Sequence, residues 1–235
     1  MTGDKEGDPR SGGLLTHAFD GQEQLYILRY RPEHAGFFHL VIRQMQGGMP
    51  FEAATIAAGL ADLNTPPAVE LHRICESTNV IAGRGQGSSL CLAEIQTAGR
   101  GRRGRAWVQP FASGLALSYG LPLRVARVDG LAIAMAVAVV EGLAACGFSG
   151  IGLKWPNDVY ACGAKLGGVM VEIAGGREPR LVVGVGVNVH VAPALDGRAT
   201  VALVALASLP SRNVLAIEIA RALVFALLEF ERAGF

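Results

Sequence analysis

Hydrophobic and polar residues alternate along this chain in a pattern that predicts short strands and a few helices. Residues 24–31 and 39–45 alternate as half-buried strands do, and residues 51–63 are rich in alanine with the pattern of a helix. The two prolines within residues 64–67 cannot continue that helix, because proline lacks the backbone N–H that a helix requires. We therefore place the main boundary of the chain at residues 64–67.

After this boundary, two long segments have the apolar face of a helix: residues 131–146, which Gly147 would end, and residues 213–233. Ser77 can cap a short helix at residues 78–81. Strands are expected at residues 69–75, 90–95, 115–119, 151–160, 166–173 and 181–189. Short turns join the last strands, which predicts an antiparallel meander. The predicted fold class is α+β, a mixed and mainly antiparallel sheet with helices on one side.

The composition excludes several classes of protein. The chain of 235 residues carries 21 Lys and Arg against 20 Asp and Glu, a formal charge of +1, so its bulk charge does not suit a polyanion binder. The apolar run at residues 131–140 is shorter than the ~20 residues that a membrane-spanning helix needs. The N-terminus has no apolar signal core. We expect a cytoplasmic protein whose residues 1–13 form a disordered leader.

Cysteine and histidine positions do not suggest a metal site. The four cysteines are separated by 16, 55 and 16 positions and form no C-x-x-C pair, and the five histidines show no ligand spacing. We therefore expect free thiols, no disulfide framework and no metal held by protein side chains.

The strongest chemical signal is the segment QTAGRGRRGRAW at residues 96–107. Its glycines let the backbone present successive N–H groups to an anion, and its four arginines add bidentate donors for phosphate or carboxylate. A loop of this kind can close over an anion once the anion has bound. The segment matches neither a Walker loop nor a Rossmann loop. From the residues alone, a nucleic-acid tether or a solvated loop stays equally open.

Four other segments carry weaker signals. The charge of Lys154, within an apolar strand, needs an anion unless the head group reaches water. The glycines that follow Lys165 and those that precede Asn188 indicate a close approach to the backbone, or only relief of crowding between strands. The Ser-Thr-Asn triplet at residues 77–79 offers polar groups at a strand-to-helix turn, as ordinary helix caps also do.

Together these segments resemble the biotin–protein ligases (biotin–[acetyl-CoA-carboxylase] ligases). The shared motifs are ESTN, QxAGRGRRGRxW, KWPND, KLxGxxVE and GxGxNV, in the family's order across about residues 68–235. The resemblance implies a fold like that of class II aminoacyl-tRNA synthetases and a reaction in two steps. Biotin and Mg·ATP first form biotinyl-5′-AMP and pyrophosphate. The biotinyl group then passes to a lysine of the biotin carboxyl carrier protein of acetyl-CoA carboxylase.

The resemblance also implies a role for individual residues. The implied catalytic residues are Lys154 and Arg102, the latter in a loop that closes over the adenylate. The implied biotin-binding residues are Ser77, Thr78, Asn79, Gln96, Arg100, Gly101, Arg102 and Lys165. The implied nucleotide-binding residues are Arg103, Trp107, Lys154, Asn157, Asp158 and Asn188. Mg²⁺ would arrive with ATP and not in a site of the protein.

Two departures from the family pattern add expectations. Residues 14–63, whose role is unclear, do not have the pattern of the winged helix found in members that repress transcription, so we expect no DNA binding. Members of the family usually continue past the last helix into an SH3-like barrel, and we expect this barrel to be absent here. The alternative functions are a lipoate–protein ligase-like enzyme and a truncated biotin- or nucleotide-binding remnant without turnover. We expect no membrane partner, and a homodimer stays open.

Overall fold

The computed structural model describes residues 50–124, 128–175, 178–194 and 197–234, together with the backbone of three upstream strands. These strands pair antiparallel in a three-stranded sheet: β1 (Leu14–Phe19), β2 (Glu23–Tyr30) and β3 (Phe38–Arg43). β2 and β3 confirm the two strands expected there, whereas β1 was not predicted. The leader expected at residues 1–13 lies outside the described residues.

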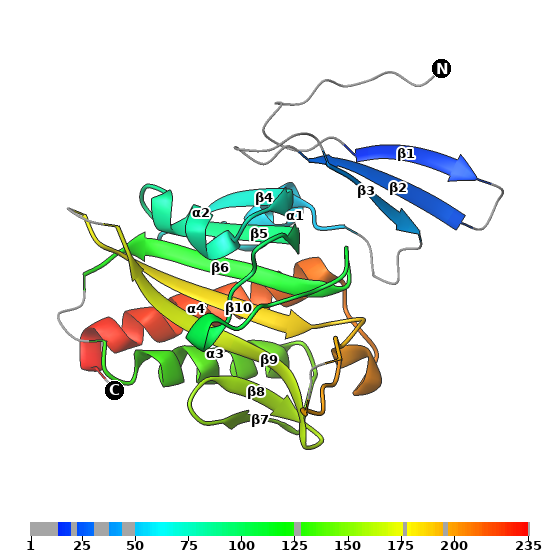
Figure 1. Ribbon diagram of the computed structural model, residues 1–235. Coiled ribbons are helices and arrows are strands. Elements are labelled where there is room, and N and C mark those ends of the chain that lie inside the picture. The colour runs from blue at the N-terminus through cyan, green and yellow to red at the C-terminus, as the bar shows by residue number, and fades with distance from the viewer. Residues whose placement is uncertain are drawn as a thin grey trace.

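A seven-stranded mixed sheet forms the centre of the molecule (Figure 1). In spatial order its strands are β4 (Ala68–Cys75), β5 (Ser89–Gln96), β6 (Gly114–Pro122), β10 (Arg180–Asn188), β9 (Ala164–Ala174), β8 (Asp158–Ala161) and β7 (Ile151–Lys154). β4 and β5 are parallel, and every other neighbouring pair in this sheet is antiparallel. The predicted α+β class and the antiparallel meander are therefore confirmed.

One predicted strand was wrong. Residues 151–160 are not a single strand but the hairpin of β7 and β8, with a turn at residues 155–157. Pro156 lies in that turn because it has no N–H to donate to a strand ladder. The hairpin places Lys154 at the end of an edge strand, where its side chain is exposed, and not inside an apolar strand as expected.

Three helices cover one face of the sheet: α1 (Ala53–Gly59), α3 (Leu131–Ala145) and α4 (Arg212–Ala233). α3 and α4 run side by side behind the strands in Figure 1. Successive residues of a strand point to opposite faces, so Leu90 and Leu92 of β5 join this core while Cys91 points away. Cys91 packs with Ala82 of α2 (Thr78–Arg84), which lies on the opposite face of the sheet. The prediction that the helices lie on one side of the sheet is therefore wrong for α2.

The segment that precedes β4 belongs to the same core. Phe51, Ile56 and Leu60 are buried among side chains of the sheet and α4. Arg221 of α4 donates hydrogen bonds to the Gly59 carbonyl and pairs with the Asp62 carboxylate. Residues 51–63 and the sheet therefore share one hydrophobic core, although the chain turns at residues 64–67 between them. Among the described helices, none is both long enough and apolar enough to cross a membrane.

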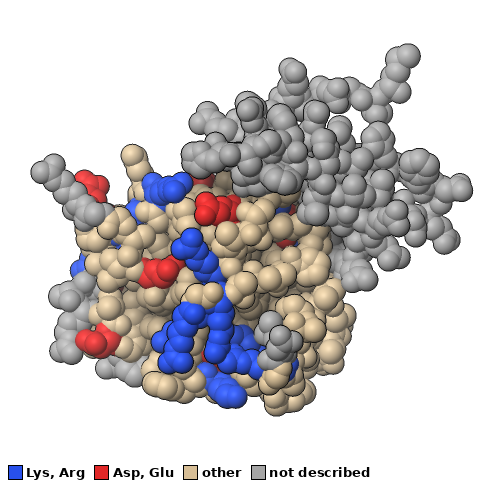
Figure 2. All heavy atoms as spheres, viewed as in Figure 1, with Lys and Arg blue, Asp and Glu red and all other residues tan. Residues whose placement is uncertain are grey.

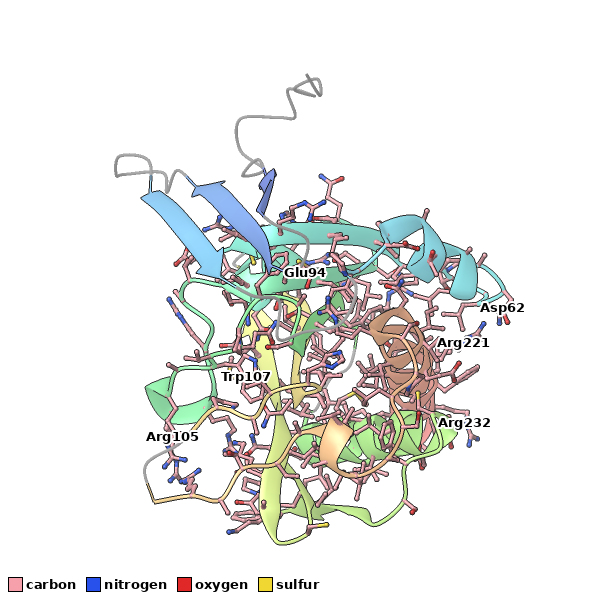
Figure 3. All side chains as sticks on the ribbon, turned by 90° about the vertical axis from the view of Figure 1, so that its right-hand side faces the viewer. Asp62, Glu94, Arg105, Trp107, Arg221 and Arg232 are labelled. Atoms are coloured by element: carbon pink, nitrogen blue, oxygen red, sulfur yellow. The ribbon has the colours of Figure 1, made fainter. Side chains whose placement is uncertain are left out.

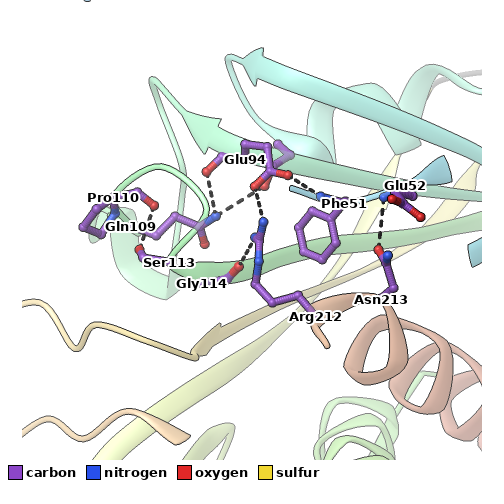
Figure 4. A network of polar contacts seen from close by, with 10 residues as sticks. Phe51, Glu52, Glu94, Gln109, Pro110, Ser113, Gly114, Arg212 and Asn213 are labelled. Atoms are coloured by element: carbon purple, nitrogen blue, oxygen red, sulfur yellow. Dashed lines mark hydrogen bonds and ion pairs between the residues drawn. The ribbon is translucent and has the colours of Figure 1, made fainter. Parts of the chain in front are cut away.

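A buried ion pair connects α4 to the sheet (Figure 4). Arg212 Nη2 lies 2.7 Å from Glu94 Oε2, and each side chain is only 1 % exposed. Arg212 Nη1 donates to the Gly114 carbonyl at 2.9 Å, and Glu94 Oε1 accepts a hydrogen bond from the Phe51 backbone N–H at 2.6 Å. Burial lowers the pKa of Arg212, whereas the nearby Glu94 carboxylate raises it. This network joins β5, β6, α4 and the segment before α1.

Replacing Arg212 with Met should lower the free energy of unfolding by about 3–5 kcal/mol, because Glu94 would be left buried without its partner. Urea denaturation measures the loss. Arg232→Met on the same helix is the matched control, since its pair with Glu229 is exposed and should contribute nothing measurable. Equal losses in the two variants would contradict a special role for the buried pair.

Candidate active site

A cavity of about 990 Å³ opens at the start of α2 and is bordered by residues 99–105, which we call the arginine loop, and by the turn between β7 and β8. Every residue to which the family resemblance assigns a role lines this cavity: Ser77, Thr78, Asn79, Gln96, Arg100, Gly101, Arg102, Arg103, Trp107, Lys154, Asn157, Asp158, Lys165 and Asn188. These residues lie up to 111 positions apart in the sequence, so the fold brings them together.

The cavity concentrates positive charge. Among the described residues that line it, seven are basic and one is acidic: Arg100, Arg102, Arg103, Arg105, Lys154, Lys165 and Arg198, against Asp158. The whole chain carries only +1, so the rest of the sequence has more acidic than basic residues. Figure 2 shows Lys and Arg side chains gathered in one band on this face. Fixed cations on a concave surface attract a small anion.

The first turn of α2 is held by a glutamine from β5. Gln96 Oε1 accepts hydrogen bonds from the Thr78 backbone N–H at 2.8 Å and from the Thr78 hydroxyl at 3.1 Å. Both bonds use the carbonyl oxygen, and Gln96 Nε2 donates to none of the other described residues, so its N–H groups can reach a ligand in the cavity. Ser77 takes the predicted N-cap position, but its side chain makes no capping hydrogen bond.

Asn79 is fixed at both ends of its amide. Its Oδ1 lies 2.6 Å from the Ser118 hydroxyl of β6, and its Nδ2 donates to Glu172 Oε2 of β9 at 2.6 Å. A Cβ at position 184 would overlap Asn79 Oδ1, so Gly184 is what lets this side chain lie against β10. We did not predict Ser118 or Glu172. Their signals were a serine among the apolar residues of β6 and the glutamate of the KLxGxxVE motif.

The arginine loop has a hydrogen-bonded stem. The Gly101 N–H donates to the Arg105 carbonyl at 2.7 Å, and the Trp107 N–H donates to the Gly99 carbonyl at 2.8 Å. A Cβ at position 99 would lie 2.5 Å from the Trp107 carbonyl oxygen, which explains a glycine there. In Figure 3 Arg105 lies at the outer part of this loop and Trp107 lies closer to the sheet.

One contact joins the arginine loop to the opposite wall of the cavity. Arg102 Nη1 donates to Asn157 Oδ1 at 3.0 Å. Asn157 is itself held to β9, because its Nδ2 donates to the Val169 carbonyl at 2.8 Å and its own carbonyl accepts from the Val169 N–H at 2.9 Å. Arg102 therefore closes the loop onto a residue that the sheet holds in place.

The two lysines of the cavity differ in their electrostatic surroundings. Lys165 Nζ lies 2.6 Å from Asp158 Oδ1, so most of its charge is already balanced. Lys154 Nζ lies 4.9 Å from the centre of the Tyr160 ring, and it forms no ion pair with any described residue. Lys154 is therefore the lysine whose charge is available to a ligand.

Asn188 supports the wall of the cavity. Its side chain is almost fully buried, and its Nδ2 donates to the Val201 carbonyl at 3.1 Å and approaches the Lys165 carbonyl at 3.5 Å. The Val201 N–H in turn donates to the Lys165 carbonyl at 3.0 Å. The amide nitrogen of Asn188 thus ties the segment around residue 201 to β9.

Comparison with known proteins shows which family this part of the chain resembles. Residues 78–188 match the model of the Biotin/lipoate A/B protein ligase family. The chain is 35 % identical over 159 residues to the bifunctional ligase/repressor BirA of Escherichia coli, which covers 65 % of this chain and 50 % of BirA. It is 38 % identical over 152 residues to the biotin–[acetyl-CoA-carboxylase] ligase of Mycobacterium tuberculosis, which covers 62 % of this chain and 56 % of that protein. The chain thus spans about half the length of these relatives.

A solved structure has the same fold. The biotin protein ligase of Leishmania major in complex with biotinyl-5-AMP is 25 % identical, has a TM-score of 0.56, and covers 72 % of this chain and 82 % of its own. The family match runs from the first residue of α2 to the last residue of β10, the elements between which the cavity is built. Residues 78–188 therefore form a domain of the Biotin/lipoate A/B protein ligase family, and the chain is similar to biotin–protein ligases over 62–65 % of its length.

Proposed function

We propose that this protein is an ATP-dependent biotin–protein ligase. It would form biotinyl-5′-AMP and pyrophosphate from biotin and ATP, and transfer the biotinyl group to a lysine of the biotin carboxyl carrier protein of acetyl-CoA carboxylase. The observation that carries this proposal is the cavity with seven basic side chains, one carboxylate and a cluster of amides and hydroxyls at one end. The names of the relatives support the choice of biotin over lipoate.

The first step brings two anions together. A carboxylate oxygen of biotin attacks the α-phosphorus of ATP, and the bond from that phosphorus to the oxygen of pyrophosphate breaks. Fixed cations are needed because the carboxylate and the phosphate repel each other, and because charge develops on the phosphoryl oxygens. Lys154 can supply that charge directly, whereas Lys165 is held in place by Asp158 and would contact the biotin carboxylate.

The order of side chains along the sheet matches the shape of biotin. Asn79 packs over Gly184, and the Trp107 indole packs over Gly186, two residues further along the same face of β10. Gly186 pairs with Gly168, which lies beside Asp158 and Lys165. The polar urea group of biotin would thus contact the amides and hydroxyls of residues 77–79 and Gln96. Its apolar ring and chain would contact Trp107, and its carboxylate would face the lysines.

This order leaves the nucleotide on the side of the arginine loop and the β7–β8 turn. We place Arg103, Asn157 and Asp158 on that side, with Arg100 and Gly101 over the junction of biotin and phosphate. Trp107 would serve biotin and not the nucleotide, because its indole lies between Asn79 and the lysines. Asn188 would act through the wall that it supports.

The second step requires that water be kept from the mixed anhydride. The ε-amine of the carrier lysine attacks the carbonyl carbon of biotinyl-5′-AMP, and AMP leaves with the electrons of the broken C–O bond. Closure of the arginine loop, held by the Arg102–Asn157 hydrogen bond, would protect the intermediate until the carrier arrives. No cysteine is needed for this transfer.

The residues present do not form a cage for Mg²⁺. Among the described residues no three His, Cys, Asp or Glu side chains gather closely enough to hold a metal ion, and the one carboxylate of the cavity, Asp158, is paired with Lys165. Mg²⁺ is commonly held by phosphate oxygens and water with few protein ligands. We therefore treat it as part of the substrate Mg·ATP.

Two measurements test the proposed function. Biotin-dependent exchange of pyrophosphate into ATP should be observed, and labelled biotin should pass to the lysine of a purified carrier domain. Binding of biotin without exchange would identify a ligand-binding remnant. Exchange with lipoate in place of biotin would identify the lipoate ligase-like alternative. We place the reaction in the cytoplasm, because the spacing of the four cysteines in the sequence does not indicate a disulfide framework.

Replacing Lys154 with Ala should reduce pyrophosphate exchange by about 10²–10³-fold, since the developing phosphoryl charge loses its free cation. The urea midpoint should not change, because this side chain is exposed. Arg84→Ala, which removes an exposed cation of α2 outside the cavity, is the control and should exchange at the parental rate. Parental exchange by the Lys154 variant would remove this residue from the mechanism.

Replacing Arg102 with Gly should speed the release of biotinyl-5′-AMP by about 10–100-fold, because one charge-assisted hydrogen bond that closes the loop is lost. Its effect on biotin affinity should be much smaller. Release of labelled adenylate from the purified complex measures the rate. Asn157→Ala removes the acceptor of the same bond and should shift the rate in the same direction. An unchanged release rate in both variants would show that this contact does not retain the adenylate.

Replacing Gly184 with Ala should weaken biotin binding by about tenfold, because the new methyl group displaces Asn79 from Ser118 and Glu172. Isothermal titration calorimetry with biotin measures the affinity. Gly152→Ala on β7 is the matched control, since a Cβ there meets no atom within 4 Å and biotin affinity should stay at the parental value. Equal affinities of the two variants would show that Asn79 does not line the biotin site.

A further inference from the structure

Gln109 lies just outside the arginine segment and was not singled out in the sequence, yet it joins the cavity to the buried network behind it. Its side chain is 8 % exposed. Gln109 Oε1 accepts a hydrogen bond from Trp107 Nε1 at 3.3 Å. Gln109 Nε2 donates to the carbonyls of Ala93 at 3.3 Å and Glu94 at 3.2 Å. The two ends of this amide therefore hold an indole of the cavity wall and the end of β5.

The indole of Trp107 has little freedom in this arrangement. On one side it lies against the backbone of β10, where a Cβ at position 186 would overlap Trp107 Cε2. Gln109, the hydrogen-bond partner of the indole, packs in turn against β6, where a Cβ at position 114 would lie 2.9 Å from Gln109 Oε1. Two glycines thus make room for the indole and for the amide that holds it.

The support behind Gln109 is rigid. Glu94, whose carbonyl accepts from Gln109, pairs through its carboxylate with Arg212, and Arg212 also donates to the carbonyl of Gly114 (Figure 4). Glu94 precedes the arginine loop and Gly114 follows it. The Arg212 guanidinium therefore binds the chain on both sides of the segment that contains the loop. Because Gln109 is bound to this part of β5, it can hold the Trp107 side chain of the cavity wall in a fixed position relative to the sheet.

We propose that Gln109 is a positioning residue that sets the orientation of the Trp107 indole, and with it the apolar wall of the biotin site. The identity of the ligand in this inference rests on the proposed function. The contact between Gln109 and Trp107 does not depend on it. The indole N–H is already used by Gln109, so Trp107 offers a ligand only its ring. Its contribution then depends on how that ring is held.

Fluorescence tests the positioning without reference to activity. The chain has two tryptophans, Trp107 and the exposed Trp155, so Trp155→Phe leaves Trp107 as the only tryptophan, which is excited selectively over the four tyrosines. In this background Gln109→Met should lower the emission anisotropy of Trp107 and increase its quenching by acrylamide. Ser113→Ala is the matched control, because it removes a hydrogen bond to the Pro110 carbonyl in the same segment without touching Trp107. Unchanged emission in the Gln109 variant would overturn the proposal.

Ligand binding tests the consequence. Gln109→Met should raise the KM for biotin about three- to tenfold, the loss expected from one neutral hydrogen bond, and leave the KM for ATP within twofold. Trp107→Phe keeps a ring but removes the indole N–H. If Gln109 acts through Trp107, adding Gln109→Met to this variant should change the biotin KM no further. An equal rise in both backgrounds would overturn the proposal.

The outcomes separate this inference from the proposed function. A changed Trp107 emission with unchanged biotin affinity would overturn the inference while exchange activity still supported the ligase. A parent protein that binds no biotin would overturn the proposed function, and the fluorescence of Trp107 would still decide whether Gln109 positions it. If Gln109→Met does not fold, Gln109→Asn, which keeps the amide on a shorter side chain, serves in both measurements with the same expected directions.

Discussion

The architecture of the candidate active site depends on one buried ion pair, between Arg212 of α4 and Glu94 of β5. An ion pair removed from water contributes little net stability, because the loss of hydration offsets the attraction. Its consequence here is geometric. The same guanidinium binds Glu94 before the arginine loop and Gly114 after it, so a helix at the end of the chain holds both ends of a loop that begins more than a hundred residues earlier.

The site beyond this anchor is built by close approach to the sheet. Gly184 and Gly186 leave two successive positions on one face of β10 without a side chain, and Asn79 and Trp107 occupy the space that side chains would fill there. A glycine destabilises a strand, and packing of the surrounding core offsets the effect of the two glycines on β10. In return Asn79 and Trp107 lie directly on the backbone of a central strand.

Charged residues are distributed unevenly between the cavity and the rest of the chain. The chain is almost neutral overall, but seven of its 21 Lys and Arg line the cavity against one of its 20 Asp and Glu, so acidic residues outnumber basic ones elsewhere. Asp158 balances Lys165, and Lys154 at the end of an edge strand is left for the ligand. The apolar strand expected around Lys154 does not exist, because Pro156 turns the chain into a hairpin. The KWPND motif singled out Lys154, whereas the single apolar strand predicted around it was wrong.

The sequence alone determined most secondary-structure elements and the chemical character of individual segments. Hydrophobic periodicity, the positions of glycines and the charge of a segment are all local properties of the chain. It predicted most strands, the two long helices and the anion-binding character of residues 96–107, and its ordered motifs indicated the family. Only the tertiary structure decided what these segments contact. Ser118, Glu172 and Gln109 matter through atoms supplied by distant strands, and no local pattern records such partners. Four arginines within six residues were ambiguous in the sequence, and the fold placed them on one wall of a cavity because Arg212 and Glu94 hold the chain on either side of them.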